Sequence, residues 1–240
     1  MAGEQKNAID YERVHGCPQP RDAHGRFDRD GLGDGVASEA PDWDFVRREE
    51  GLDLVAKVPK KDGKPIGRSG VTIGHGFDIG QWSEADFGTL DIEPAEREKL
   101  KNRFRPFFGL KGTEAEAALA ANGTPTVTRA QAKALFEAVR GRIHDQVRDR
   151  YNRDLQDARH EHLPRFEDLP SEAQTVILSV AYQYGADLRR RTPRFWDRVV
   201  RQDWQAAVEE LRDFGDAVHE KRRKREAARL DDMLRRRRGN

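Results

Sequence analysis

The sequence is poor in cysteine and in long apolar runs, and it has almost no excess of charge of either sign. Its single cysteine, Cys17, excludes an internal disulfide framework and cannot by itself form a thiolate metal site. No apolar run is long enough to span a bilayer, so we expect no transmembrane segment. The first residues, MAGEQKNAIDYERVHG, lack the apolar core of a secretory signal, and we expect synthesis in the cytoplasm without a signal peptide.

The charges nearly cancel. Charged residues make up 36% of the 240 residues, but 44 Lys and Arg stand against 43 Asp and Glu, which leaves a formal net charge of +1. This balance excludes an overall field that would attract nucleic acid or membrane, so any such contact must be local. We expect a monomer with no nucleic-acid partner, and the length suits one domain with a tail.

Residues 1–41 differ in composition from the rest of the chain. They are rich in Gly, Asp, Arg and His and show almost no apolar periodicity, so they cannot bury enough surface to offset the entropy of ordering. The run from Asp28 to Gly35 faintly resembles a calcium loop, but it lacks the spaced ligands and the closing glutamate of an EF-hand. We predict a flexible leader at 1–41, followed by a folded domain at 42–240.

The most unusual stretch is the ribbon from Gly70 to Gly80, GVTIGHGFDIG, which carries four glycines. Glycine inside a strand marks a bulge, a bend or a place where a ligand lies against the main chain. Its apolar residues favour a strand, while Thr72 and Asp78 are the polar groups that could touch a substrate or a water. A glycine-rich hairpin without chemistry, with Asp78 in an Asx turn, is the other interpretation.

A short helix is predicted upstream of the ribbon, from Asp42. Trp43, Val46 and Glu50 fall on one of its faces, and Gly51 would end it. Glu49 is the alternative acid, but we favour Glu50 because the glycine follows it. A carboxyl at the carboxy-terminal end of a helix, among apolar neighbours, is favoured in its protonated form.

Glu50-Gly51 followed by Thr72 to Asp78, TIGHGFD, resembles the phage-type lysozymes, most closely the branch represented by the activity domain of the bacteriocin pesticin. That branch carries Glu-Gly followed by T-I-G-x-G-F-D. The resemblance implies an α+β, mostly α, two-lobed lysozyme-like fold with a small antiparallel sheet in the N-terminal lobe and a long connecting helix. It also implies a lysozyme (N-acetylmuramidase) that needs no metal or cofactor and acts on peptidoglycan glycan strands after delivery or cell lysis.

In this interpretation Glu50 is the acid of an inverting reaction, Asp78 is the base, and Thr72 holds the attacking water. Asp62 is the alternative base, since the best-known phage members place their aspartate before the threonine. It lies at the wrong spacing and at a predicted turn tip. Three further residues are expected in the substrate groove: Gln81, Tyr182 and Gln183.

The remaining pattern is helical. We predict a small lobe at about 42–127, a linking helix at about 128–151 and a helical lobe at about 152–240. Asp62-Gly63 predicts a hairpin turn. Helix starts are predicted at five caps: Ser83 to Asp86, Thr113 to Glu116, Thr128 to Gln131, Ser171 to Gln174, and Thr192-Pro193.

Two further features were interpreted conservatively. His75 has no second ligand at metal spacing apart from Asp78, so it is assigned to a variable position, and His160 and His162 receive no function. The basic runs Lys221–Arg225 and Arg235–Arg238 are predicted to be a solvated helix face, with contact to anionic envelope groups as the alternative. A catalytically silent module that binds cell wall or nucleic acid through this helix is the alternative function.

Overall fold

The computed structural model describes residues 40–158, 160, 162–215 and 218–239. The predicted leader therefore lies outside the described residues, apart from positions 40 and 41. No helix in the described part of the chain combines the length and the apolar character that a membrane span requires. The predicted α+β, mostly helical architecture with a small antiparallel sheet is confirmed.

Helix α1 (Trp43–Glu50) begins and ends where the sequence predicts. The carboxylate of Asp42 accepts a hydrogen bond from the backbone N–H of Phe45 at 2.9 Å, which caps the first turn. Gly51 has φ of 70°, a left-handed conformation that glycine adopts without strain. The helix therefore stops at Glu50.

The ribbon forms two strands of a three-stranded antiparallel sheet. Its strands are β1 (Asp53–Lys57), β4 (Thr72–Gly74) and β5 (Phe77–Asp78), in the order β1-β4-β5. Thr72 pairs with Asp78, and Ile73 pairs with Phe77. Because opposed residues of antiparallel strands point to the same face, Thr72 and Asp78 share one face and the buried Ile73 and Phe77 share the other.

A separate hairpin joins β2 (Lys60–Lys61) to β3 (Lys64–Pro65). Its turn residues, Asp62 and Gly63, have φ of 52° and 76°, the positive values that a two-residue type I′ turn requires. The predicted turn is confirmed. The lysines at the tip are exposed, and Lys60 pairs with Glu116 at 2.5 Å.

The described residues form two large buried apolar cores and a small third cluster of Phe45, Val46 and Phe136. The sheet-side core comprises side chains from the sheet, from the first half of α5 (Arg129–Asp157), and from α2 (Glu84–Phe87), α3 (Pro94–Phe104) and α4 (Gly112–Asn122). Short 3-10 turns at Ile79–Gln81 and Arg105–Phe107 complete this region. The helical core is built by the last part of α5 and by five further helices: α6 (Ser171–Tyr184), α7 (Leu188–Arg191), α8 (Pro193–Val200), α9 (Trp204–Arg212) and α10 (Glu220–Gly239).

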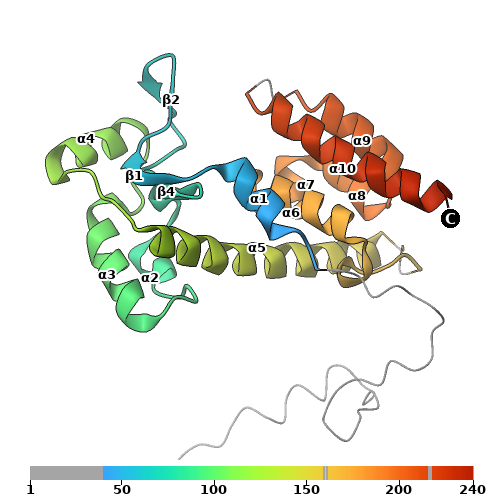
Figure 1. The fold of residues 1–240 in the computed structure, drawn as a ribbon, viewed down its shortest axis with the longest axis horizontal. Helices are drawn as coiled ribbons and strands as arrows, with labels where there is room; N and C mark the ends of the chain where they lie inside the picture. The colour runs from blue at the N-terminus through green and yellow to red at the C-terminus, as the bar shows by residue number, and fades with distance from the viewer. Residues whose placement is uncertain (1–39, 159, 161, 216–217, 240) are drawn as a thin grey trace, which may run out of the picture. The chain divides into compact units, whose positions relative to one another are not determined.

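Helix α5 (Arg129–Asp157) passes from the sheet and helices α2 to α4 to helices α6 to α10 (Figure 1). It runs six residues past the predicted end at about 151. Ala132 and Leu135 belong to the sheet-side core, whereas Val147 and Tyr151 belong to the helical core. The apolar face of α5 is thus shared between the two cores, and Val139 and Ile143 in its middle line the cleft described below.

The predicted caps are correct at some helices and wrong at others. Ser83 caps α2, and Thr128 with Gln131 forms a reciprocal capping box on α5. Helix α4 instead starts at Gly112, before Thr113. Ser171 lies inside the first turn of α6, where its hydroxyl donates to the carbonyl of Ala40. The capping pattern at these two sites was wrong because the N-cap residues are Lys111 and Pro170, which precede Thr113 and Ser171.

The close approach of the ribbon to its neighbours predicts that replacing one of its glycines by alanine lowers stability. A Cβ on Gly80 would lie 2.2 Å from the carbonyl oxygen of Leu110, so we expect Gly80→Ala to lower the free energy of unfolding by about 1–3 kcal/mol. Gly141, in the exposed middle of α5, has no atom within 4 Å of such a Cβ. Gly141→Ala should therefore raise the free energy by about 0.5–1 kcal/mol. Urea unfolding measures both, and a Gly80→Ala variant as stable as the wild type would contradict this packing.

Candidate active site

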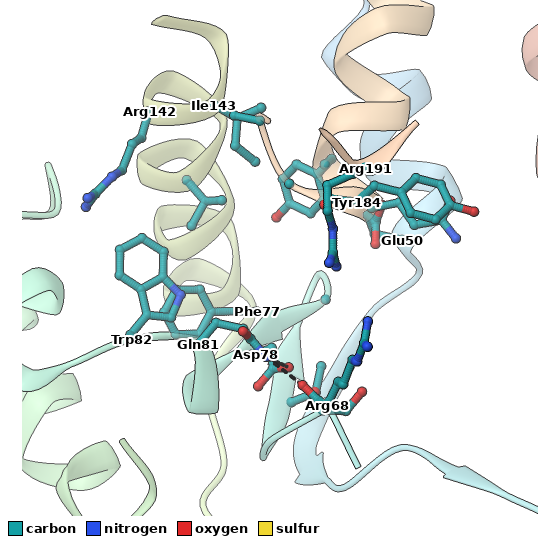
Figure 2. Close-up of a pocket in the computed structure, with 18 of the residues that line it drawn as sticks. Glu50, Arg68, Phe77, Asp78, Gln81, Trp82, Arg142, Ile143, Tyr184 and Arg191 are labelled. Carbon is teal, nitrogen blue, oxygen red and sulfur yellow. Dashed lines mark hydrogen bonds between the residues drawn. The ribbon is translucent and has the colours of Figure 1, made fainter. Parts of the chain in front are cut away.

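A cleft of about 1040 Å³ lies between the sheet, α5 and the carboxy-terminal end of α6. The residues predicted for the site all line it: Glu50, Thr72, Asp78, Gln81, Tyr182 and Gln183. Val139 and Ile143, from the middle of the α5 stripe, supply part of its apolar wall. Figure 2 shows Glu50 and Asp78 entering the cleft from different elements. The structure therefore brings together residues that lie far apart in the sequence.

Glu50 is the most enclosed carboxyl in contact with the cleft. Its side chain is 13% exposed, and Arg222 donates a hydrogen bond from Nη1 to Oε1 at 2.6 Å. Its Oε2 lies against Gly76, where a Cβ would approach to 2.8 Å. Gly76 also has φ of 73°, so both conformation and space require glycine there. One oxygen of Glu50 is thus held by Arg222, and the other faces the ribbon.

Burial raises the pKa of Glu50 above its ordinary value. The positive charges of Arg222, His219 and Arg223 oppose this effect, but the loss of solvation is the larger contribution. The hydroxyl of Tyr182, whose own pKa is raised by burial and by the nearby Glu50, adds no positive charge. The environment therefore favours the protonated carboxyl, which can donate a proton.

Arg222 is itself held by a buried polar network that the sequence did not reveal. Glu226 has no exposed surface, and its Oε1 accepts hydrogen bonds from Arg222, from Arg223 and from Ser179 at 3.2, 2.9 and 2.5 Å. Arg222 also donates to the carbonyl oxygen of Ser179 at 2.8 Å. The network connects α6 and α10 directly behind Glu50.

The interpretation of the first basic run as a solvated face was partly wrong. Arg222 and Arg223 are buried, whereas Lys221, Lys224 and Arg225 are exposed. A guanidinium becomes buried here because the facing carboxylates are buried with it. The spacing of Arg222 and Glu226, four residues apart on one helix, was the signal available in the sequence.

Glu49, the alternative acid, points elsewhere. Its two oxygens accept hydrogen bonds from Nε and Nη2 of Arg225 at 2.6 and 2.5 Å. It does not line the cleft. Glu49 is therefore a structural partner of α10, and Glu50 is the glutamate of this helix that faces the cleft.

Asp78 is oriented by three N–H donors. The backbone N–H of Gly70 lies 3.0 and 3.1 Å from its two oxygens, and the N–H of Gly80 lies 3.0 Å from Oδ1. Gln81 donates from its side-chain amide to Oδ2 at 3.1 Å and to the carbonyl of Arg68 at 2.8 Å. The carboxyl group is thus fixed at the end of β5 by the ribbon itself.

Thr72 lies beside Asp78 as its cross-strand partner. Its hydroxyl is half-buried and donates to the carbonyl of Gly70 at 3.3 Å. A hydroxyl can accept as well as donate, so Thr72 keeps an acceptor for a molecule in the cleft. Asp62, the substitute base, lies at the exposed hairpin tip and does not line the cleft.

Tyr182 and Gln183 close the helical side of the cleft. The Tyr182 hydroxyl donates to the carbonyl of His75 at 3.1 Å, which ties α6 to the turn of the ribbon. The side-chain oxygen of Gln183 accepts from Arg223 at 2.7 Å, and its amide nitrogen has no hydrogen-bond partner among the described residues. That nitrogen is buried.

His75 has a local structural role. Its ring packs edge-on against Phe136, with centroids 5.5 Å apart, and its Nδ1 contacts the carbonyl of Gly51. Burial lowers its pKa. Within the described residues, neither His75, His160, His162 nor any other side chain belongs to a cluster of three or more metal-ligating groups.

Several cleft residues were not predicted. Trp82 stacks on Phe77, with centroids 5.4 Å apart, and Arg142 lies 5.2 Å from the Trp82 ring centroid. Besides Arg142, four further cations from three other segments line the cleft: Arg68, Lys111, Arg190 and Arg191. Neither Trp82 nor these cations belongs to a motif in the sequence, so only the fold could assemble them.

The raised pKa of Glu50 predicts how stability changes with pH. In the unfolded chain the Glu50 carboxyl ionises near its ordinary pKa of 4.5, whereas in the folded chain it keeps its proton to a higher pH. The wild type therefore loses stability as the pH rises from 4.5 through the pKa of Glu50 in the folded protein. Glutamine cannot ionise. We therefore expect Glu50→Gln to gain stability relative to the wild type across this window, by at most about 1.4 kcal/mol per pH unit.

Urea unfolding of both proteins at a series of pH values tests this expectation. Glu226 is present in both proteins, so the difference isolates Glu50. A difference that stays constant or falls as the pH rises would show that Glu50 ionises as easily in the folded chain as in the unfolded one.

Comparison with known families identifies the domain that carries this cleft. The model of the Pesticin family, described as a bacterial toxin homologue of phage lysozyme, C-terminal part, matches residues 41–205. The matched segment includes Glu50, Thr72 and Asp78 and ends before α10. No curated protein matches the chain. Because the family match covers more than half of the sequence, the chain belongs to the Pesticin family of phage-lysozyme homologues.

Proposed function

We propose that the protein is an N-acetylmuramidase that hydrolyses the β-1,4 bond between N-acetylmuramic acid and N-acetylglucosamine in peptidoglycan. Membership of a family of phage-lysozyme homologues supports a lysozyme-like peptidoglycan hydrolase. The observation that carries the finer proposal is the presence of Glu50 in the same cleft as the Thr72–Asp78 pair, on different elements. Glycosidic hydrolysis requires two carboxyl groups on opposite sides of the scissile bond.

Glu50 is the proton donor in this proposal. Its burial favours the neutral form, and one of its oxygens faces the ribbon side of the cleft. A neutral carboxyl can protonate the leaving oxygen as the bond breaks. Arg222 then stabilises the carboxylate that remains, because its Nη1 already contacts Oε1.

Asp78 is the base, and Thr72 positions the water. Their side chains lie on one face of the β4–β5 pair, where a water between them could donate to the carboxylate and to the threonine hydroxyl. Gln81 supports the base through its contact with Oδ2. Gln81, Tyr182 and Gln183 are proposed as groove residues for the sugar.

We further propose a monomeric hydrolase domain at 42–240, with the lobes and linking helix given above and with residues 1–41 as a leader used in delivery. The domain would act on the wall after delivery or lysis. Contact with anionic envelope groups is proposed only for the exposed residues of the two basic runs on α10: Lys221, Lys224, Arg225 and Arg235–Arg238.

Exchange of the acid provides the first test of the function. Release of reducing ends from purified sacculi should fall at least about a hundredfold in Glu50→Gln, because a positioned general acid contributes that much or more. Glu49→Gln is the matched control, since Glu49 pairs with Arg225 outside the cleft, and it should retain most of the rate. Equal losses in the two variants would contradict the assignment of Glu50.

The products also distinguish the alternatives. Release of amino groups without reducing ends would indicate a peptidase or amidase. Co-sedimentation with sacculi without any cleavage would favour a catalytically silent wall-binding module.

The stereochemistry tests the roles of Thr72 and Asp78. A water held between them would attack from the face opposite the leaving group, so hydrolysis should proceed with inversion and give the α-anomer first from a β-linked glycan. Proton NMR of a soluble muropeptide oligomer in the first minutes of reaction records the anomer before mutarotation. Initial β-anomer, or a glycosyl adduct on Asp78, would mean that Asp78 is a nucleophile.

A further inference from the structure

The cleft contains cations that have no carboxylate partner in the described part of the chain. Four side chains share this property: Arg68, Lys111, Arg142 and Arg191. Other arginines are commonly paired, as Arg190 in the same cleft is with Asp187 at 3.3 Å and Arg201 outside it is with Asp197 at 2.9 Å. Among the described residues, cations without a carboxylate partner also occur at the surface, as Lys61 and Lys64 do in the hairpin, but these four line one cleft.

The carboxyl groups that line the cleft do not neutralise these cations. Glu50 is paired with Arg222, Asp78 accepts from backbone and amide N–H groups, and Asp86 accepts from the hydroxyl of Ser83 at 2.6 Å. The four cations therefore outnumber the two cleft carboxylates that have no cationic partner among the described residues, Asp78 and Asp86. A concave site with an excess of positive charge attracts anionic ligands. The charge of the cleft therefore favours a sugar substrate that carries an anionic substituent.

Arg68 and Arg191 are the best placed of the four. Figure 2 shows their guanidinium groups pointing toward one another, Arg191 from α7 and Arg68 from the segment before β4. Arg191 uses Nε to donate to the carbonyl of Tyr184 at 3.1 Å, which leaves its two terminal nitrogens for a ligand. The carbonyl of Arg68 accepts from Gln81, the residue that also contacts Asp78. Both guanidinium groups are thus attached to the walls that carry the proposed chemistry.

We propose that Arg68 and Arg191 bind carboxylates that the wall glycan carries beside the scissile bond. This inference rests on the proposed function. The sugar rings of the glycan are neutral, so its negative charge comes from the peptide stems or, where a stem has been removed, from the lactyl group. A planar guanidinium matches a carboxylate through two parallel hydrogen bonds. A densely charged polyphosphate would also meet Glu50 and Asp78 in the same space, which favours a sparsely charged glycan.

The test uses the intact protein and three preparations of sacculi. One is untreated, one has its carboxyl groups converted to amides with carbodiimide and ammonia, and one is stripped of stems by an amidase. Wild-type kcat/KM for reducing-end release should fall roughly tenfold on amidated sacculi, as expected for loss of a charge-assisted hydrogen bond. Arg68→Gln and Arg191→Gln should each show a similar loss on untreated sacculi, and their difference from the wild type should disappear on amidated sacculi.

Arg201→Gln is the matched control, because Arg201 is an exposed arginine outside the cleft, and it should behave as the wild type on all three preparations. If stem carboxylates are bound, stripped glycan should behave like amidated sacculi. If the lactyl carboxylate can take the place of a stem carboxylate, stripped glycan should remain a good substrate although amidated sacculi are poor; either result supports carboxylate recognition and identifies its source. Equal wild-type rates on untreated and amidated sacculi would overturn the proposal.

A binding measurement separates this inference from the proposed function. Glu50→Gln should co-sediment with untreated sacculi more strongly than with amidated sacculi, and adding Arg68→Gln or Arg191→Gln should abolish that preference. If the wild type cleaves no glycan, the proposed function fails while the binding result still tests the cations. If cleavage occurs but the preference for carboxylates is absent, only the inference fails.

Discussion

The buried contact between Glu50 and Arg222 is the interaction on which the site depends. It joins two residues 172 positions apart, one at the end of α1 and the other on α10. Removing two charges from water is costly, so such a pair persists only where its remaining hydrogen-bonding groups are also satisfied. Ser179 and Glu226 accept further hydrogen bonds from Arg222, while burial raises the pKa of Glu50. The same contact therefore positions the proposed acid and provides a countercharge for the carboxylate it becomes.

The opposite side of the cleft is governed by the absence of side chains. Gly70 and Gly80 approach so closely that a Cβ on Gly70 would lie 2.5 Å from Cα of Gly80, and both N–H groups point at Asp78. Gly76 leaves room for the Glu50 carboxyl. The two halves of the proposed chemistry thus have different physical origins, since Asp78 is oriented by backbone amides and Glu50 by the buried guanidinium of Arg222. The cations that line the same cleft, Arg68 and Arg191 among them, are consistent with a substrate whose sugar rings are neutral and whose substituents are acidic.

The sequence predicted the parts of the fold and site that depend on local chemistry. The end of α1 at Gly51, the turn at Asp62-Gly63 and the box at Thr128 follow from backbone rules that act over a few residues. The mostly helical α+β class and the family were also correct. The basic run around Arg222 was misjudged, because burial of an arginine depends on carboxylates that only folding brings near it. Gln81, Tyr182 and Gln183 do line the cleft, but their roles toward substrate remain proposals.

The central claim is that Glu50 acts in its protonated form, and the most direct measurement compares its titration with the pH dependence of catalysis. Carbon NMR of the Glu50 side-chain carboxyl gives the pH at which it ionises in the folded protein. The basic limb of kcat/KM for reducing-end release gives the pH at which the free enzyme loses its essential acid. The account predicts that the two midpoints coincide, above the ordinary value of 4.5. A Glu50 carboxyl that is already ionised throughout the active pH range would contradict it.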